Sequence, residues 1–454
     1  MNKTIILFLL LFALVSCSGN APTSTPEPLG TPTAAALPAP TAIRTPPVGG
    51  LYVDPAQNLG PISPYLYGSN YGPWIAVPTD MLDPTFASGV TVVRFPGGSW
   101  GDHNDVKTYQ IDAFMNFVGQ MEAAATFTVR LLDGTPEQAA EMVRYTNLEK
   151  QYGVVYWAIG NEPTLFADEL NVGNYDTKRF NEEWRAFALA MKAVDPTIQL
   201  IGPEIHQYSA DPNVQPKDAN GLNWMDEFLK TNGDLVDVVT IHRYPYGTDI
   251  TIEELRQNSK EWDATIPYLR TRIHELTGRD LPIAITEINT HYNKAVGGEA
   301  TPDSHYNAIW LADVFGRMMK NGVFMVNHWL LTSSGGQGGW GLIGRGELRP
   351  SYFTYQMFTQ HFGDTLLYSA SDDPIVSIYA AQRPDGARTI LLINMASEPV
   401  QKTLTLDGQT TSQDAEVWLF DAAHNAEQVE SIPIGPTTDL TLSPESLTLL
   451  VLAP

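Results

Sequence analysis

Cysteine and positively charged residues are scarce in this chain, and both shortages exclude certain kinds of protein. Cys17 is the only cysteine among 454 residues, so the folded part has no internal disulfide and must be stabilised by its core. Lysine and arginine together number 27, against 51 aspartates and glutamates, and the formal net charge is −24. A surface of this sign repels nucleic acid and anionic lipid headgroups, so we expect neither to bind the folded part. A neutral substrate fits this charge best.

Clustered metal ligands and phosphate-binding loops are also missing from the sequence. The nine histidines form no tight group, and the acidic residues do not have the spacing of a calcium loop. No glycine-rich phosphate loop follows the first predicted strand. We therefore predict neither a catalytic metal nor a cofactor.

The N-terminus carries an apolar run that is too short to span a bilayer as a permanent helix. Residues 5–15 are uninterruptedly apolar, whereas a membrane-spanning helix needs about 20 such residues. The run ends in Leu14-Val15-Ser16-Cys17, which resembles the lipobox of bacterial lipoproteins. That resemblance implies that 1–16 is a signal peptide, and that Cys17 carries a diacylglyceryl anchor to the membrane of the cell envelope after export. The alternative is an ordinary signal peptide that happens to contain a cysteine.

A spacer follows the predicted signal peptide and covers residues 17–49. Within it, 21–48 contain eight prolines and six threonines and no aromatic residue. No hydrophobic period survives there, and proline removes backbone donors, so we expect an extended stalk.

The region 50–364 alternates short apolar, β-branched runs with longer amphipathic stretches. Eight such repeats predict an α/β fold, a (β/α)8 TIM barrel, with the parallel strands buried on both faces. An open, doubly wound sheet is the alternative, which the missing phosphate loop disfavours. The predicted strands are 65–70, 91–95, 127–132, 155–160, 199–202, 238–242, 283–287 and 324–330, and the predicted helices are 111–124, 136–151, 177–194, 224–230, 252–276 and 304–321.

The last part of the chain, 365–454, has a different texture, with short strands separated by turns and no convincing helix. It predicts a C-terminal antiparallel β-sandwich, to which residues 51–54 could add a strand. A packing and stabilising role is favoured for it over sugar binding. The predicted strands are 375–381, 389–393, 401–406, 415–420 and 446–452.

Two glutamates lie where two predicted barrel strands end. The fourth strand runs directly into Asn161-Glu162-Pro163, and the seventh ends in Thr286-Glu287. Strand C-termini are where the active sites of such barrels gather, and strands four and seven lie nearly opposite each other. Two carboxyls in different surroundings can divide the roles of acid and nucleophile. A separation of about 5 to 5.5 Å would indicate a retaining glycosidase, and about 6.5 to 9.5 Å an inverting one.

Together these motifs resemble clan A of the glycoside hydrolases. In that clan the acid/base glutamate follows an asparagine at the end of strand four, and the nucleophile ends strand seven. The resemblance implies that Glu162 is the acid/base and Glu287 the nucleophile.

The same resemblance implies roles for five further residues. Arg94 would bond the nucleophile, Asn161 the sugar 2-hydroxyl, and His242 and Tyr244 would orient or bond the nucleophile. Trp329 would form an aromatic floor under the sugar. A surface ion pair for Arg94, structural roles for His242 and Tyr244, and core packing for Trp329 are the alternatives.

The substrate is less well specified than the mechanism. Arg94 to Gly98 resembles the arabinofuranosidase family 51, whereas Gly160 to Phe166 is closer to families 39, 79 and 44. We therefore expect a plant cell-wall or related polysaccharide or oligosaccharide as substrate, cleaved by an activity of α-L-arabinofuranosidase, β-xylosidase or endo-glucanase type. A catalytically silent, lipid-anchored glycan-binding protein on the same barrel is the alternative.

Overall fold

The computed structural model describes residues 50–168, 172–334 and 338–454. The predicted signal peptide, Cys17 and the spacer to residue 49 lie outside these ranges. Within them, no helix is both long enough and apolar enough to cross a membrane.

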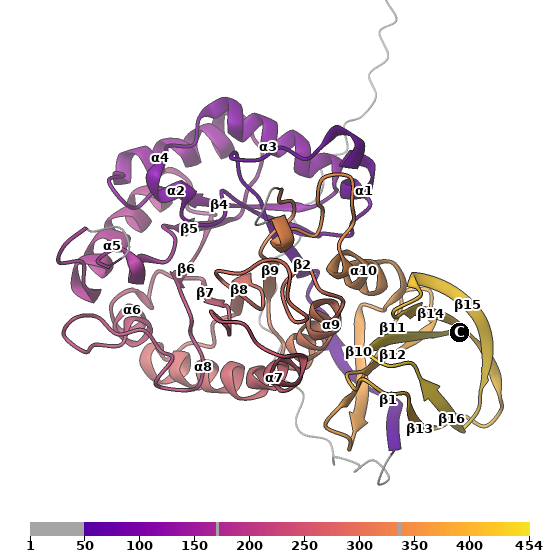
Figure 1. Cartoon of the computed structure of the whole chain (residues 1–454). Coiled ribbons are helices and arrows are strands. Elements are labelled where there is room, and N and C mark those ends of the chain that lie inside the picture. Colours follow the sequence, from indigo (N-terminus) through magenta and orange to yellow (C-terminus); the bar gives the residue numbers. More distant parts are fainter. Residues whose placement is uncertain (1–49, 169–171, 335–337) are drawn as a thin grey trace, which may run out of the picture. The chain divides into compact units, whose positions relative to one another are not determined.

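Eight parallel strands close into a barrel, in the order of the sequence (Figure 1). Their short segments are buried at almost every position, as expected for strands covered on both faces. The predicted (β/α)8 fold is therefore confirmed. The strands are β2 (Tyr65–Asn70), β3 (Val92–Phe95), β4 (Ala124–Val129), β5 (Tyr156–Ile159), β6 (Gln199–Ile205), β7 (Val238–Arg243), β8 (Ile283–Ile288) and β9 (Met325–His328).

Helices connect the strands and surround the barrel (Figure 1). Side-chain caps define several of their starts: Thr135, Asp176 and Asn223 each accept a hydrogen bond from a backbone N–H of the first turn. The helices are α1 (Leu82–Phe86), α2 (Trp100–His103), α3 (Thr108–Gln120), α4 (Pro136–Val143), α5 (Thr177–Val194), α6 (Trp224–Asn232), α7 (Ile252–Asn258), α8 (Trp262–Thr277), α9 (His305–Lys320) and α10 (Pro350–Gln356).

One predicted helix, 252–276, is divided in the structure into α7, a 3-10 turn (Ser259–Glu261) and α8. At the break, Asn258 accepts a hydrogen bond from the Trp310 indole of α9, and Ser259 donates one to Asp313 of the same helix. These contacts with a neighbouring helix coincide with the break. The apolar period of the segment gives no sign of them, so the sequence predicted one continuous helix.

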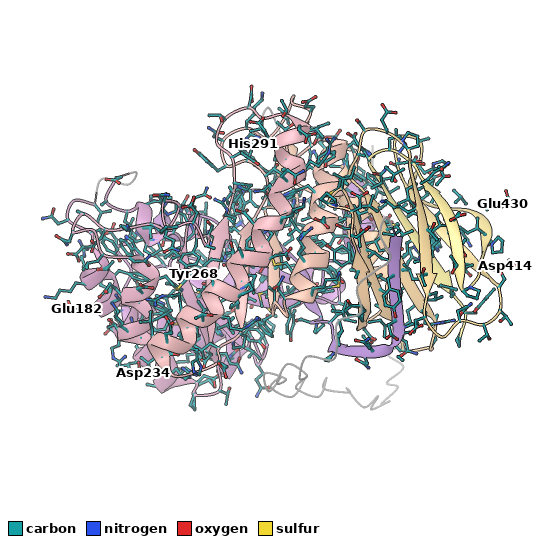
Figure 2. All side chains as sticks on the ribbon, turned by 90° about the horizontal axis from the view of Figure 1, so that it is seen from below. Glu182, Asp234, Tyr268, His291, Asp414 and Glu430 are labelled. Atoms are coloured by element: carbon teal, nitrogen blue, oxygen red, sulfur yellow. The ribbon has the colours of Figure 1, made fainter. Side chains whose placement is uncertain are left out.

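The remaining strands form a nine-stranded sheet in the order β15-β14-β17-β12-β11-β10-β1-β13-β16. All pairs are antiparallel except β1 with β13. Because β1 pairs with both β10 and β13, the N-terminal strand predicted at 51–54 joins the C-terminal sheet. Figure 2 shows Asp414 and Glu430 projecting outward from β14 and β15. The strands are β1 (Gly50–Pro61), β10 (Thr365–Ser371), β11 (Val376–Gln382), β12 (Arg388–Asn394), β13 (Val400–Leu406), β14 (Gln413–Phe420), β15 (Asn425–Ile434), β16 (Thr437–Leu442) and β17 (Ser446–Leu452).

Helix α9 makes several of the contacts between barrel and sheet. The Tyr379 hydroxyl of β11 donates to Asp313 Oδ1 at 2.7 Å, and Lys320 Nζ donates to the carbonyl of Ser369 at 3.0 Å. Asp313 is also paired with Arg317 at 2.8 Å and is fully buried. A buried polar network of this kind fixes the orientation of two packed surfaces, because each unpaired group would be costly.

Candidate active site

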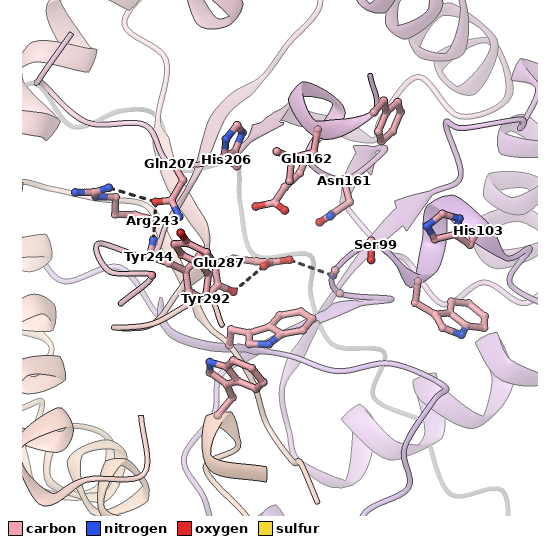
Figure 3. A pocket seen from close by; sticks show the side chains of 18 of the residues that line it. Ser99, His103, Asn161, Glu162, His206, Gln207, Arg243, Tyr244, Glu287 and Tyr292 are labelled. Atoms are coloured by element: carbon pink, nitrogen blue, oxygen red, sulfur yellow. Dashed lines mark hydrogen bonds between the residues drawn. The ribbon is translucent and has the colours of Figure 1, made fainter. Parts of the chain in front are cut away.

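A cleft of about 1010 Å³ opens where the barrel strands end (Figure 3). This is the face on which the loops after the strands meet, and where barrel enzymes place their chemistry. Aromatic side chains from several of these loops line it, together with both glutamates predicted from the sequence. The aromatic residues are Trp74, Trp100, Phe166, Tyr244, Tyr292, Trp329 and Trp340.

Glu162 and Glu287 face each other in this cleft (Figure 3). One carboxylate oxygen of each and one ring nitrogen of His242 all lie within 4.8 Å of one another. The side chain of Glu287 is only 5% exposed, and that of Glu162 is 20% exposed. This approach of the nearest oxygens is compatible with the separation of about 5 to 5.5 Å between the carboxyl groups of a retaining pair.

Glu287 is held by three donors. Arg94 Nη1 donates to its Oε1 at 2.8 Å, the Gly98 backbone N–H donates to the same oxygen at 3.0 Å, and the Tyr244 hydroxyl donates to Oε2 at 2.8 Å. Burial, followed by the charges of Glu287 and Glu162, raises the pKa of Tyr244 well above its usual value, so the phenol keeps its proton. Gly98 has φ +63°, and a Cβ there would lie 2.5 Å from the Trp329 ring, so the close approach needs glycine.

Arg94 is completely buried and connects several site residues. Besides Glu287, its Nη2 donates to Asn161 Oδ1 at 2.8 Å and pairs with Glu204 Oε2 at 2.8 Å. The amide oxygen of Asn161 therefore accepts from Arg94, and Asn161 also lines the cleft. Arg94 and Tyr244 both donate to Glu287, and Arg94 also donates to Asn161.

His242 lies between carboxylates. Its Nδ1 is 2.9 Å from Glu162 Oε1 and 3.8 Å from Glu287 Oε2, and its Nε2 is 3.1 Å from Glu204 Oε2. The sequence suggested a role beside the nucleophile, whereas the closest partner in the cleft is the acid/base candidate. Burial alone would lower the pKa of His242, but Glu287 and the hydrogen bonds to Glu162 and Glu204 outweigh it and raise the pKa to about 9.

The surroundings of Glu162 stabilise its ionised form. Burial would raise its pKa, but the hydrogen bond and charge of His242, with smaller contributions from His206 and Arg94, lower it overall. Its backbone has φ 45° and ψ 53°, a left-handed conformation that is uncommon for a residue with a side chain. The Glu162 N–H donates to the carbonyl of Glu204 at 2.9 Å, which helps to fix this conformation.

Trp329 lines the cleft. It stacks on Trp74, with ring centroids 6.1 Å apart and planes inclined by 23°. The ring centroid of Trp74 is in turn 6.5 Å from that of Trp100. Indole faces arranged in this way suit the C–H faces of sugar rings.

Glu204 and His206 are among the residues of the site that were not found from the sequence. Glu204 is fully buried at the end of β6, and His206, two residues later, lines the cleft with its Nδ1 2.5 Å from the Thr164 hydroxyl. The only signal for Glu204 is a charged residue inside an otherwise apolar strand, which by itself points to no particular partner.

The described residues contain one group with the composition of a metal site, Glu162, His242 and Glu287. Both ring nitrogens of His242 face carboxylates, and the raised pKa keeps the ring protonated at neutral pH. In that protonated state both ring N–H groups donate to carboxylates, as in an acid–base cluster.

Asp102 of α2 lies behind Asn161, and its Oδ2 accepts the Asn161 backbone N–H at 3.2 Å. Burial raises its pKa to about 8, against the opposing effects of Arg94 and of backbone donors. The unfolded carboxyl ionises near pH 3.9, so the stability associated with Asp102 is fully present below that pH and is lost as pH rises toward 8.

We therefore expect Asp102→Asn to become more stabilising, relative to the unmodified protein, between pH 5 and pH 8. The difference in unfolding midpoint should grow by about 2 °C or more, measured by calorimetry at both pH values. A difference that does not change with pH would show that Asp102 is ionised in the folded protein.

No protein-family model matches the sequence, and no curated protein matches it either. Solved structures do share the fold. An α-L-arabinofuranosidase from Thermotoga maritima aligns with a TM-score of 0.71 and 19% identity over 89% of this chain and 99% of that one. A family 44 xyloglucanase from Paenibacillus polymyxa aligns with a TM-score of 0.70 and 16% identity over 89% of this chain and 99% of that one. A bifunctional glucanase-xylanase from a metagenome library aligns with a TM-score of 0.69 and 18% identity over 89% of this chain and 98% of that one. The chain therefore has the barrel-plus-sheet fold of these glycoside hydrolases over nearly their whole length.

Proposed function

We propose that the protein is a retaining glycoside hydrolase with Glu287 as nucleophile and Glu162 as acid/base. The observation that carries this proposal is the approach of the two carboxylates to within 4.8 Å in a cleft lined with aromatic rings. The two have different partners: three donors fix Glu287, whereas Glu162 contacts a histidine that can exchange a proton with it. That asymmetry suits one nucleophile and one proton-transfer group.

The reaction would run in two displacements. A Glu287 oxygen bonds to the anomeric carbon while the glycosidic C–O bond breaks, and Glu162 supplies the proton that the departing oxygen takes. Water then attacks the same carbon, Glu162 takes the proton from that water, and the ester to Glu287 is broken. Arg94, Gly98 and Tyr244 keep the attacking carboxylate oriented. The Asn161 amide would bond the sugar 2-hydroxyl.

A neutral cell-wall polysaccharide or a fragment of one is the substrate that these features favour. The cleft lies at the upper end of the usual range for ligand pockets, about 300 to 1,000 Å³, so it has room for more than one sugar ring. Its aromatic wall and the net charge of −24 both suit uncharged sugars. Activity of α-L-arabinofuranosidase, β-xylosidase or endo-glucanase type fits the proposal.

Turnover of defined substrates tests this function. Aryl α-L-arabinofuranosides, β-xylosides and β-glucosides should be screened together with xylan, xyloglucan and mixed-linkage oligosaccharides, with the anomeric form of the first product followed by proton NMR. Hydrolysis with retained configuration is expected. Inverted product would contradict the double displacement, and binding without turnover would favour the catalytically silent glycan-binding alternative.

We also propose that the protein is exported and anchored to the cell envelope through Cys17, on the strength of the lipobox-like Leu14-Val15-Ser16-Cys17 alone. Cys17→Ser should release the protein from the membrane fraction, because the thioether that carries the lipid cannot form. Fractionation of cells that express either form, with a blot for the protein, measures this. Equal membrane association of the two forms would point to a different anchor.

A further inference from the structure

A chain of alternating charges connects the two glutamates of the cleft beneath its surface. Glu287 pairs with Arg94 at 2.8 Å, Arg94 with Glu204 at 2.8 Å, Glu204 with His242 at 3.1 Å, and His242 with Glu162 at 2.9 Å. Glu204 is the central member, is fully buried and is absent from the cleft lining. It touches both residues that hold the proposed catalytic carboxylates, although it touches neither of those carboxylates with its own side chain.

Strands β7 and β8 and the segment after β5 hold Glu204 in this position. The Thr286 hydroxyl of β8 donates to Glu204 Oε1 at 3.1 Å, and the Glu204 N–H donates to the Thr240 hydroxyl of β7 at 2.9 Å. The Glu204 carbonyl accepts the Glu162 N–H, and Glu204 itself has a left-handed φ of +58°. A residue with a side chain adopts this conformation only where its surroundings over-determine it.

The two contacts of His242 restrict where its protons can be. A neutral imidazole carries one N–H, yet each ring nitrogen lies within 3.1 Å of a carboxylate oxygen. Burial would raise the pKa of Glu204, but Arg94 and His242 outweigh it and lower that pKa, so Glu204 stays ionised. An ionised Glu204 can only accept from Nε2. The remaining proton then lies between Nδ1 and Glu162.

We propose that Glu204 is a positioning residue that keeps a proton on His242 Nε2, so that His242 Nδ1 and Glu162 share the one proton used in catalysis. The inference rests on the proposed function and deepens it. In the first displacement the shared proton goes to the departing glycosidic oxygen. In the second, the attacking water returns a proton to the Glu162–His242 pair, and the Nε2 proton is never transferred.

This arrangement explains how a glutamate with a lowered pKa can serve as an acid. The pair as a whole retains its proton up to the raised pKa of His242, about 9, although Glu162 alone would not. The titratable and charged groups around His242 are Arg94 from β3, Glu162 after β5, Glu204 and His206 at the end of β6, Arg243 and Tyr244 beside it, and Glu287 from β8, with Asp102 of α2 behind Asn161.

Glu204→Gln tests the inference, because it removes the charge at nearly constant volume. The pKa of His242, followed by NMR of the ¹⁵N-labelled ring and assigned with His242→Gln, should fall by about 1 to 3 pH units. The alkaline limb of kcat/KM should move down by the same amount for a substrate with a poor leaving group. Glu204→Asp, which keeps the charge, should restore much of the pKa.

Asp313→Asn is the matched control, since Asp313 is an equally buried, ion-paired acid at the contact between barrel and sheet. It should change stability without moving the pKa of His242. If Glu204→Gln does not fold, NMR of the unmodified protein still tests the inference. Both ring nitrogens of His242 should then carry protons at pH 7. A singly protonated ring at pH 7, or an unchanged pKa in Glu204→Gln, overturns the inference. Failure of the unmodified protein to hydrolyse any glycoside would instead count against the proposed function, because the NMR measurement needs no turnover.

Discussion

Glu287→Gln should lower turnover of every glycoside substrate by about 10⁴-fold or more, the order of loss seen when a nucleophile is removed. An amide does not attack an anomeric carbon, yet glutamine fills the same volume, and its oxygen can still accept from Arg94 or Tyr244. Substrate binding, measured by calorimetry, should therefore persist while kcat is lost. Mass spectrometry after treatment of the unmodified protein with an activated 2-fluoro glycoside should find the label on Glu287.

The smaller Glu287→Ala variant adds a second readout for the nucleophile. Azide could enter the space that the carboxylate leaves, and turnover with azide should give a product of inverted configuration. Asp313→Asn serves as the control for the loss of a buried, paired carboxylate away from the cleft. A label on another residue, or turnover by Glu287→Gln close to that of the unmodified protein, would remove Glu287 from the role of nucleophile.

Glu162→Ala should have an effect that depends on the leaving group. Positioned proton transfer contributes about 10² to 10⁴-fold, so kcat/KM for natural linkages should fall by that factor. A dinitrophenyl glycoside needs no proton on its departing oxygen, so its glycosylation step should change far less. The acid/base limb of the pH profile should disappear as well. Steady-state kinetics with a series of aryl glycosides of graded leaving-group pKa measures these effects.

Glu261→Ala provides a control for this second experiment. Glu261 pairs with Arg243 at 2.7 Å near the cleft, and its side chain is 20% exposed, as is that of Glu162. Any loss in this variant should be equal for good and poor leaving groups. An equal loss for both kinds of substrate in Glu162→Ala would show that Glu162 does not supply the proton.

Much of the site could be predicted because the residues that carry its chemistry lie in or next to short, recognisable segments of the sequence. Each of the eight barrel strands is an apolar run of a few residues, and Glu162 and Glu287 come where two of these runs end. Once the barrel is recognised, its symmetry places both glutamates at one face. Strands β10, β15 and β16 were missed in the C-terminal sheet. Most residues of β15 and β16 are polar and exposed and leave no clear apolar alternation.

The barrel, the pair of glutamates and the ends of the strands that carry them follow from the sequence alone, because hydrophobic period and short motifs are properties of neighbouring residues. The contact of His242 with Glu162, and the contacts of Glu204 with His242 and Arg94, follow only from the tertiary structure. These residues come from strands β3, β6 and β7 and from the segment after β5. The pairing register shifts between Gly202 and Ile205 and again between Ile241 and His242. Such irregularities change which side chains point into the barrel, and they depend on how neighbouring strands fit together when the barrel closes.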